Sequence, residues 1–89
     1  MESIIQSNKE CFLCGRGNWL DKHHVLHGYN RDKADKDGLT VWLCHECHMN
    51  LHQRGWHDRE LKALAEKTWC EHYGKTTEDF IDRYGKSYQ

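Results

Sequence analysis

The 89-residue sequence contains no proline, no long hydrophobic run and almost no excess of charge. A transmembrane helix needs about 20 consecutive apolar residues, so we expect no membrane span. The 13 basic and 14 acidic residues give a formal net charge of −1, unlike the strongly basic composition that favours nucleic-acid binding by charge alone. The first residues also lack the basic and apolar regions of a signal peptide, and we therefore expect a reducing, cytoplasmic location.

Apolar residues are also scarce, at 37% of the chain against 30% charged residues. A chain of this length buries only roughly 60–65% of its unfolded surface, which leaves a small core. Such domains usually need an additional stabilising element, and the five cysteines and eight histidines suggest that it is a metal. No linker, repeat or low-complexity segment divides the sequence, so we expect a single domain over residues 1–89.

The order of apolar and polar segments predicts a small α+β fold. Residues 39–43 are β-branched and apolar, which is typical of the second strand of a hairpin. A 3.6-residue period after Asp58, which is expected to be the N-cap, predicts a helix that ends at Gly74. The expected elements are a strand at 19–26, a polar loop at 28–38, a strand at 39–43, a helix at 44–52, a helix at 58–74 and a helix from Thr76 or Thr77 to Gly85. The last two helices, at about 58–85, should cover the hairpin.

Two Cys-x-x-Cys pairs, Cys11/Cys14 and Cys44/Cys47, give the strongest motif. Each pair can direct two sulfurs at one ion, and two pairs complete the tetrahedral set of a structural zinc site. The alternatives are two disulfides or a redox-active pair, which the expected reducing location disfavours. The fifth cysteine, Cys70, is expected to lie outside this cluster.

Four histidines suggest a second metal site. His48 and His52 are four residues apart, a spacing that places both on one face of a helix. His23 and His24 are adjacent on a strand, so their side chains should point to opposite sides. One of them can be a third ligand, and the other is then free for acid–base chemistry, for which histidine is suited by a pKa near neutrality. The alternative is that each histidine is a surface or capping residue.

Together these motifs resemble the HNH endonucleases, a family often encoded by phages and mobile elements. The resemblance is carried by Cys11-x-x-Cys14, His23-His24 and Leu43-Cys44-x-x-Cys47-His48-x-x-x-His52. It implies a ββα-metal (His-Me) finger at about 11–55, with a structural zinc knuckle and two C-terminal helices. It also implies a metal-dependent endonuclease that nicks or cleaves DNA in a bacterial or phage-infected cell.

Carried over to this chain, the resemblance implies that His24 is the general base. The implied ligands are His23, His48 and His52 for a catalytic Mg²⁺, Mn²⁺, Ni²⁺ or Zn²⁺, and Cys11, Cys14, Cys44 and Cys47 for a structural Zn²⁺. The expected partners are DNA, a phage terminase or another protein, and a second copy in a homodimer.

The sequence departs from the family at the middle Asn, which holds the loop that orients the general base. That position falls near Gly38 and Leu39, neither of which can act in this way. Asn30 and Asp37 are the candidates for a substitute loop anchor. The departure favours the alternative function, a catalytically weak or inactive zinc-stabilised module that binds DNA or protein. A redox protein that uses the Cys-x-x-Cys pairs is a third possibility.

Basic residues near the expected finger are candidates for phosphate contacts. We single out Arg31 and Arg54, because arginine commonly binds the phosphates of DNA. The alternative is that they are solvated, because Asp32, Asp35 and Asp37 lie among the basic residues of the expected loop.

Overall fold

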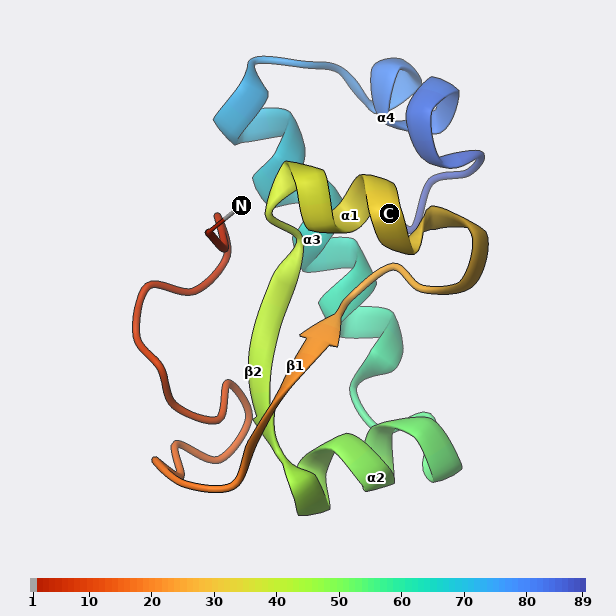
Figure 1. Ribbon diagram of the computed structural model, residues 1–89. Helices are drawn as coiled ribbons and strands as arrows, with labels where there is room; N and C mark the ends of the chain where they lie inside the picture. The colour runs from red at the N-terminus through yellow and green to blue at the C-terminus, as the bar shows by residue number, and fades with distance from the viewer. Residues whose placement is uncertain (1) are drawn as a thin grey trace.

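A two-stranded antiparallel hairpin forms the centre of the fold, and helices pack around it (Figure 1). The computed structural model describes residues 2–89. Its elements are β1 (Leu20–His24), the 3₁₀ helix η1 (Gly28–Asn30), α1 (Arg31–Asp37), β2 (Thr40–Cys44), α2 (His45–Arg54), α3 (Asp58–Tyr73) and α4 (Thr77–Tyr84). The protein is therefore a small α+β fold, as the sequence predicts.

The register of the hairpin determines which side chains of β1 share a face. Leu20 pairs with Cys44 at one end of the hairpin, and His24 pairs with Thr40 at the other. Side chains alternate along a strand, so Asp21 and His23 share one face of β1 and Lys22 and His24 share the other. The two faces of β1 thus present different chemistry, although its two histidines are adjacent in sequence.

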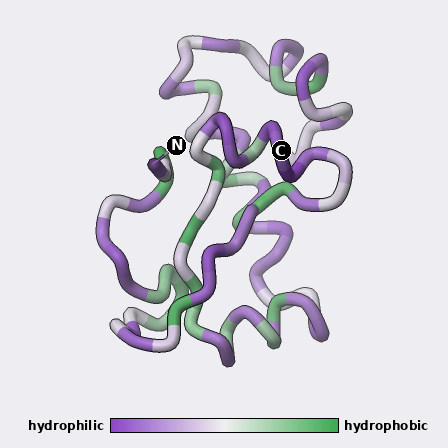
Figure 2. The backbone as a smooth tube through the Cα atoms, viewed as in Figure 1, coloured by the Kyte–Doolittle hydropathy of each residue, from purple (hydrophilic) through white to green (hydrophobic). Residues whose placement is uncertain are grey.

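The prediction of a loop at 28–38 is wrong, because η1 and α1 occupy this segment. Ala34 is the only apolar residue of α1, and the helix is hydrophilic along nearly its whole length (Figure 2). Apolar periodicity therefore could not reveal it. Gly38 ends the helix in the left-handed conformation, with φ of 80°, and a Cβ there would lie 2.5 Å from the carbonyl oxygen of Glu2. A side chain at position 38 would thus clash with backbone.

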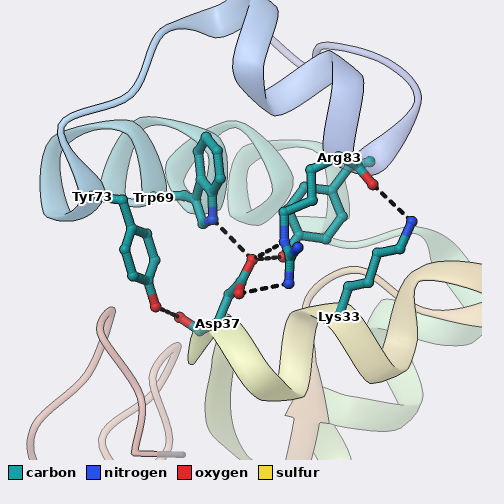
Figure 3. Close-up of polar contacts among 6 residues, drawn as sticks. Lys33, Asp37, Trp69, Tyr73 and Arg83 are labelled. Atoms are coloured by element: carbon teal, nitrogen blue, oxygen red, sulfur yellow. Dashed lines mark hydrogen bonds and ion pairs between the residues drawn. The ribbon is translucent and has the colours of Figure 1, made fainter.

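The buried carboxylate of Asp37 joins α1 to the two C-terminal helices (Figure 3). Trp69 Nε1 donates a hydrogen bond of 2.9 Å to Asp37, and the Tyr84 hydroxyl donates another. The Arg83 guanidinium donates two, one from Nε and one from Nη2. Figure 3 also shows the Tyr73 hydroxyl directed at the Asp37 carbonyl, which it reaches at 3.0 Å.

We expect Asp37→Ala to lower the free energy of unfolding by about 3 kcal/mol, because two buried donors, Trp69 Nε1–H and Tyr84 O–H, would lose their acceptor. Denaturant unfolding of the zinc-loaded protein measures the change. Asp32→Ala is the control, since Asp32 is exposed on the same helix. Equal stability of the two variants would contradict a structural role for the Asp37 cluster.

The C-terminal helices follow the sequence prediction with one correction. Thr76 caps α4 through a capping box with Asp79, and Gly74 and Gly85 end α3 and α4. Asp58 is the first residue of α3, whereas the cap position is His57, which has a φ of 59°. The two helices contribute Trp69, Phe80 and other buried residues to the core.

The N-terminal segment lies along β2 (Figure 1). Ile4 N donates to the carbonyl of Gly38, Ser3 Oγ donates to the carbonyl of Thr40, and Trp42 N donates to Gln6 Oε1. The outer edge of β2 is therefore covered. Over residues 2–89, no helix combines the length and apolar character that crossing a membrane requires.

Candidate metal centres and the neighbouring histidine

Four cysteines lie close enough together to bind a structural metal such as zinc. They are Cys11, Cys14, Cys44 and Cys47, and their sulfurs all lie within 4.8 Å of one another. All four are free thiols, and Cys14 Sγ is 3.7 Å from Cys44 Sγ, against about 2.05 Å in a disulfide. This contact joins one Cys-x-x-Cys pair to the other, as expected for sulfurs that share an ion.

The local backbone explains how the cysteine cluster forms. Cys11 N donates to the carbonyl of Arg16, and Gly15 N donates to the carbonyl of Cys11, which closes the first turn around Gly15 at φ of 82°. In the second pair, Cys44 ends β2 and Cys47 lies in the first turn of α2. The cysteine cluster thus fastens the N-terminal turn to the junction between the hairpin and α2.

The surroundings act differently on two of these thiols. Burial raises the pKa of Cys11, but hydrogen bonds from backbone amides, that of Cys44 first, outweigh it and lower this pKa to about 6. Burial and the neighbouring sulfurs raise the pKa of Cys47. Four thiols this close cannot all ionise without a cation between them, so the donor set fits a soft divalent ion such as Zn²⁺.

A second cluster, of His23, His48 and His52, lies between β1 and α2. One ring nitrogen from each residue lies within 4.8 Å of the others, and His48 Nε2 is 3.0 Å from His52 Nε2. His23 is 3% exposed, and among the described residues its Nε2 is a buried polar atom with no hydrogen-bond partner. A buried nitrogen without a partner is costly. A metal ion would satisfy it, so the residues present fit such a group.

Asp21 supports the histidine cluster from the same face of β1. Its Oδ2 accepts hydrogen bonds from His48 Nδ1 at 3.0 Å and from His45 Nδ1 at 3.2 Å. These bonds lower the pKa of Asp21. With Nδ1 protonated toward the carboxylate, His48 Nε2 keeps the lone pair that can bind a metal ion, which is how proteins commonly orient metal-binding histidines.

Burial lowers the pKa of His23 to about 4, with further lowering by the charges of His48 and His52. Burial also lowers the pKa of His52. A lowered pKa keeps the imidazole neutral at pH 7, and only the neutral form can bind a metal ion. The electrostatics of this cluster therefore favour metal binding over proton binding.

His24 lies on the opposite face of β1, where it meets α1. Its Nε2 is 3.0 Å from Asp35 Oδ1, and Lys22 Nζ is 3.3 Å from the same oxygen. Hydrogen bonds from His24, first, and from Lys22 lower the pKa of Asp35. Because a carboxylate only accepts, His24 Nε2 carries the hydrogen, and Nδ1 is the nitrogen with a free lone pair.

Asn30 and Asp37, the two candidate loop anchors, form their side-chain hydrogen bonds with residues other than His24. Asn30 Nδ2 donates to the carbonyl of Tyr84 at 2.9 Å and so connects the end of η1 to α4. Asp37 holds the C-terminal helices, as described above. The residue that hydrogen-bonds to His24 is instead Asp35.

The two candidate phosphate-binding arginines lie in different places. Arg31, at the start of α1, lines an open depression together with His24, Asp32, Asp35 and Lys36. Arg54 is exposed at the end of α2, two residues after His52. The structure thus brings Arg31 near the candidate base. Arg54 and His52 are two residues apart on α2 and so do not share a face of the helix.

A fourth histidine near the cluster was not expected from the sequence. The ring centroid of His27 lies 6.1 Å from that of His52, and His27 is exposed. Asp21, which shares a face of β1 with His23, could have been found from the two-residue period of the strand. Asp35 and His27 could not, because their positions depend on η1 and α1.

Comparison of the chain with protein-family models, with curated proteins and with solved structures gave no match in any of the three.

Proposed function

We propose that this protein is a metal-dependent endonuclease of the HNH type, in which β1, β2 and α2 form a ββα-metal finger that hydrolyses DNA phosphodiester bonds. The observation that carries the proposal is the histidine cluster, whose buried His23 Nε2 lacks a partner beside two further ring nitrogens. Its ligands come from β1, the first strand of the hairpin, and from α2, the helix that follows the second strand. The zinc knuckle is adjacent, because Cys47 and His48 are neighbours on α2.

The free edge of β1 provides a place for a phosphate. The sheet has two strands, so the edge of β1 away from β2 lacks a strand partner. No other backbone hydrogen bond from residues 2–89 reaches Leu20–His24. A phosphate along this edge would have the histidine cluster on one side and His24 on the other. In-line attack on phosphorus needs groups on two sides, one for the water and one for the leaving oxygen.

In the proposed mechanism, His24 Nδ1 accepts a proton from the attacking water while Asp35 holds Nε2–H. The water oxygen bonds to phosphorus and the bond to the 3′ oxygen breaks. The leaving 3′ oxygen takes a proton from solvent, and His24 later returns its own proton to solvent. A divalent ion held by His23, His48 and His52 would stabilise the charge on the phosphate and on the leaving oxygen. Arg31, beside His24 in the depression, is suited to bind a phosphate oxygen.

Incubation of the zinc-loaded protein with supercoiled plasmid tests this function. We expect conversion to open circles with added Mg²⁺, Mn²⁺ or Ni²⁺. A lone finger attacks one strand, so linear product should appear after open circles, by a second nick or within a dimer. If the protein binds a second ion and leaves the plasmid intact under all three conditions, the proposal is wrong.

Asp35→Asn is expected to lower kcat about tenfold with little change in KM. The amide can present a hydrogen-bond donor to His24 and so reverse its tautomer, but it does not remove a group that binds substrate. Steady-state nicking kinetics measure both constants. Asp35→Glu should recover part of kcat because it keeps the carboxylate, and Asp32→Asn on the same helix is the control. A change confined to KM would show that Asp35 acts on binding instead.

Asp21→Ala is expected to weaken metal binding at the histidine cluster about 10–100-fold, because His48 loses the acceptor that orients its ring. Calorimetric titration of the zinc-loaded protein with Ni²⁺ measures the affinity. The structural zinc should be retained, since the hydrogen bonds of Asp21 go to His45 and His48 and not to a cysteine. Unchanged Ni²⁺ affinity would contradict this role of Asp21.

The second candidate function is a zinc-stabilised module without useful catalysis. The observation that favours it is the departure from the family's Asn near Gly38 and Leu39, since Gly38 has no side chain and a Cβ there would lie 2.5 Å from the carbonyl oxygen of Glu2. Metal content distinguishes the two candidates. A single tightly bound zinc per chain favours the module, whereas a second, exchangeable ion favours the endonuclease.

A further inference from the structure

We propose that the ion at the histidine cluster has a fourth protein ligand, His27, in addition to His23, His48 and His52. The resemblance to the HNH family gives ligand roles to the last three only, and His27 lies beyond the end of β1. This inference rests on the proposed function, because it completes the ligand set of the same metal centre.

The ring of His27 lies at the border of the histidine cluster. Within the cluster, the ring centroids are 5.2 Å apart for His23 and His48, 5.6 Å for His23 and His52, and 4.7 Å for His48 and His52. The centroids of His27 and His52 are 6.1 Å apart, with 60° between the ring planes. The spacing of the fourth ring from its neighbour is thus close to the spacing among the three ligands.

The backbone of His27 is held in place, whereas its ring can turn. Val25 and Leu26, which precede it, are buried, and its carbonyl accepts a hydrogen bond of 3.4 Å from Asn30 N. The side chain is exposed, and over residues 2–89 its ring takes part in no hydrogen bond or ion pair. Exposed side chains change rotamer within nanoseconds, so the ring can turn toward an ion without breaking a hydrogen bond.

The pKa values of two cluster members also reflect the proximity of His27. Burial first, and then the charges of neighbouring histidines, lower the pKa of His23 and of His52, and His27 is one of these neighbours in both cases. Rings this close repel one another when they are protonated, and the neutral form is the one that binds a metal ion. The surroundings of His27 therefore favour a shared cation over a proton on each ring.

A set of four imidazoles favours particular ions. Imidazole nitrogen suits Zn²⁺ and Ni²⁺, whereas Mg²⁺ prefers oxygen ligands, so a fourth histidine should strengthen the binding of Zn²⁺ and Ni²⁺ most. A catalytic zinc can expand to five ligands, which leaves room for one phosphate oxygen beside four imidazoles. His27 would thus add affinity for the ion without closing the site to substrate.

The test follows the ring nitrogens of the eight histidines by NMR. Protein labelled with ¹⁵N and loaded with one Zn²⁺ is titrated with a second equivalent at neutral pH, and single variants such as His27→Gln assign the signals. We expect the ring signals of His27 to shift together with those of His23, His48 and His52. The signals of His72, which is exposed on α3, should stay unchanged.

Calorimetric titration with Ni²⁺ gives a second readout. His27→Gln should weaken binding at the cluster at least about tenfold, since loss of even an outer partner of a ligand costs about 10–100-fold. His72→Gln is the matched control and should bind Ni²⁺ normally. Because His27 is exposed, the unfolding midpoint of His27→Gln should be unchanged, which separates weaker binding from loss of the fold.

Two results would each overturn the inference and leave the proposed function intact. One is unchanged ring signals of His27 while those of the other three histidines shift, and the other is equal Ni²⁺ affinity of His27→Gln and His72→Gln. Shifts of all four histidines without plasmid nicking in any metal would refute the endonuclease and leave a four-histidine metal site. No shift at any of the four would refute both proposals.

Discussion

Cys44→Ser is expected to leave the protein unfolded, whereas Cys70→Ser should leave it folded with its zinc. Structural zinc sites contribute about 10–16 kcal/mol, which is as large as the whole free energy of unfolding of a typical domain, about 5–15 kcal/mol. Cys44 is 1% exposed and lies where β2 meets α2, so its loss removes a ligand at the centre of the fold. Cys70 is only partly buried on α3 and is outside the cysteine cluster.

Circular dichroism and zinc analysis of the two purified variants test this expectation. A strong chelator should unfold the unaltered protein in the same way, and added Zn²⁺ should restore its spectrum. If Cys44→Ser keeps a cooperative unfolding transition of normal midpoint, the cysteine cluster is not the stabilising element. Cys70→Ser is the control. If it keeps its zinc and a normal unfolding midpoint, the effect of Cys44→Ser is specific to the four clustered cysteines.

His24→Ala is expected to lower the rate of plasmid nicking about 10²–10⁴-fold, the usual contribution of a general base. The substitution removes the imidazole that Asp35 orients but leaves the ligands of both clusters in place. We therefore expect normal zinc content, normal affinity for the second ion and an unchanged unfolding midpoint. Plasmid nicking, metal analysis, calorimetric titration with Ni²⁺ and denaturant unfolding of one preparation measure these quantities.

His72→Ala is the control, because His72 is exposed on α3 and belongs to neither cluster. It should nick the plasmid at the normal rate. If His24→Ala nicks as fast as this control, another group takes the proton from water. If His24→Ala fails to fold, the loss of nicking carries no information on catalysis, and His24→Gln, which preserves polarity and much of the volume, replaces it in the comparison.

The features predicted correctly from the sequence are those that depend on spacing within short segments. The Cys-x-x-Cys pairs and the four-residue spacing of His48 and His52 bring their side chains together within single turns. The hairpin and the C-terminal helices have clear apolar patterns and caps. For the same reason, the opposite orientation of His23 and His24 followed from strand geometry alone.

The features missed depend on α1. This helix has one apolar residue, and its stability comes from contacts with distant parts of the chain, such as those of Asp37 with Trp69 and Arg83. Apolar periodicity does not report such polar contacts. As a result, the sequence shows Asp35 only as one of the acidic residues of an expected polar loop, whereas the structure places it against His24.

The most direct test combines a metal count with plasmid nicking for the unaltered protein and for the double variant His48→Ala/His52→Ala. We predict that the unaltered protein binds two ions per chain and nicks the plasmid. We predict that the double variant is folded, binds one zinc and does not nick. Nicking by the double variant at the normal rate, or a single ion in an unaltered protein that nicks, would contradict the claim that the histidine cluster holds the catalytic metal.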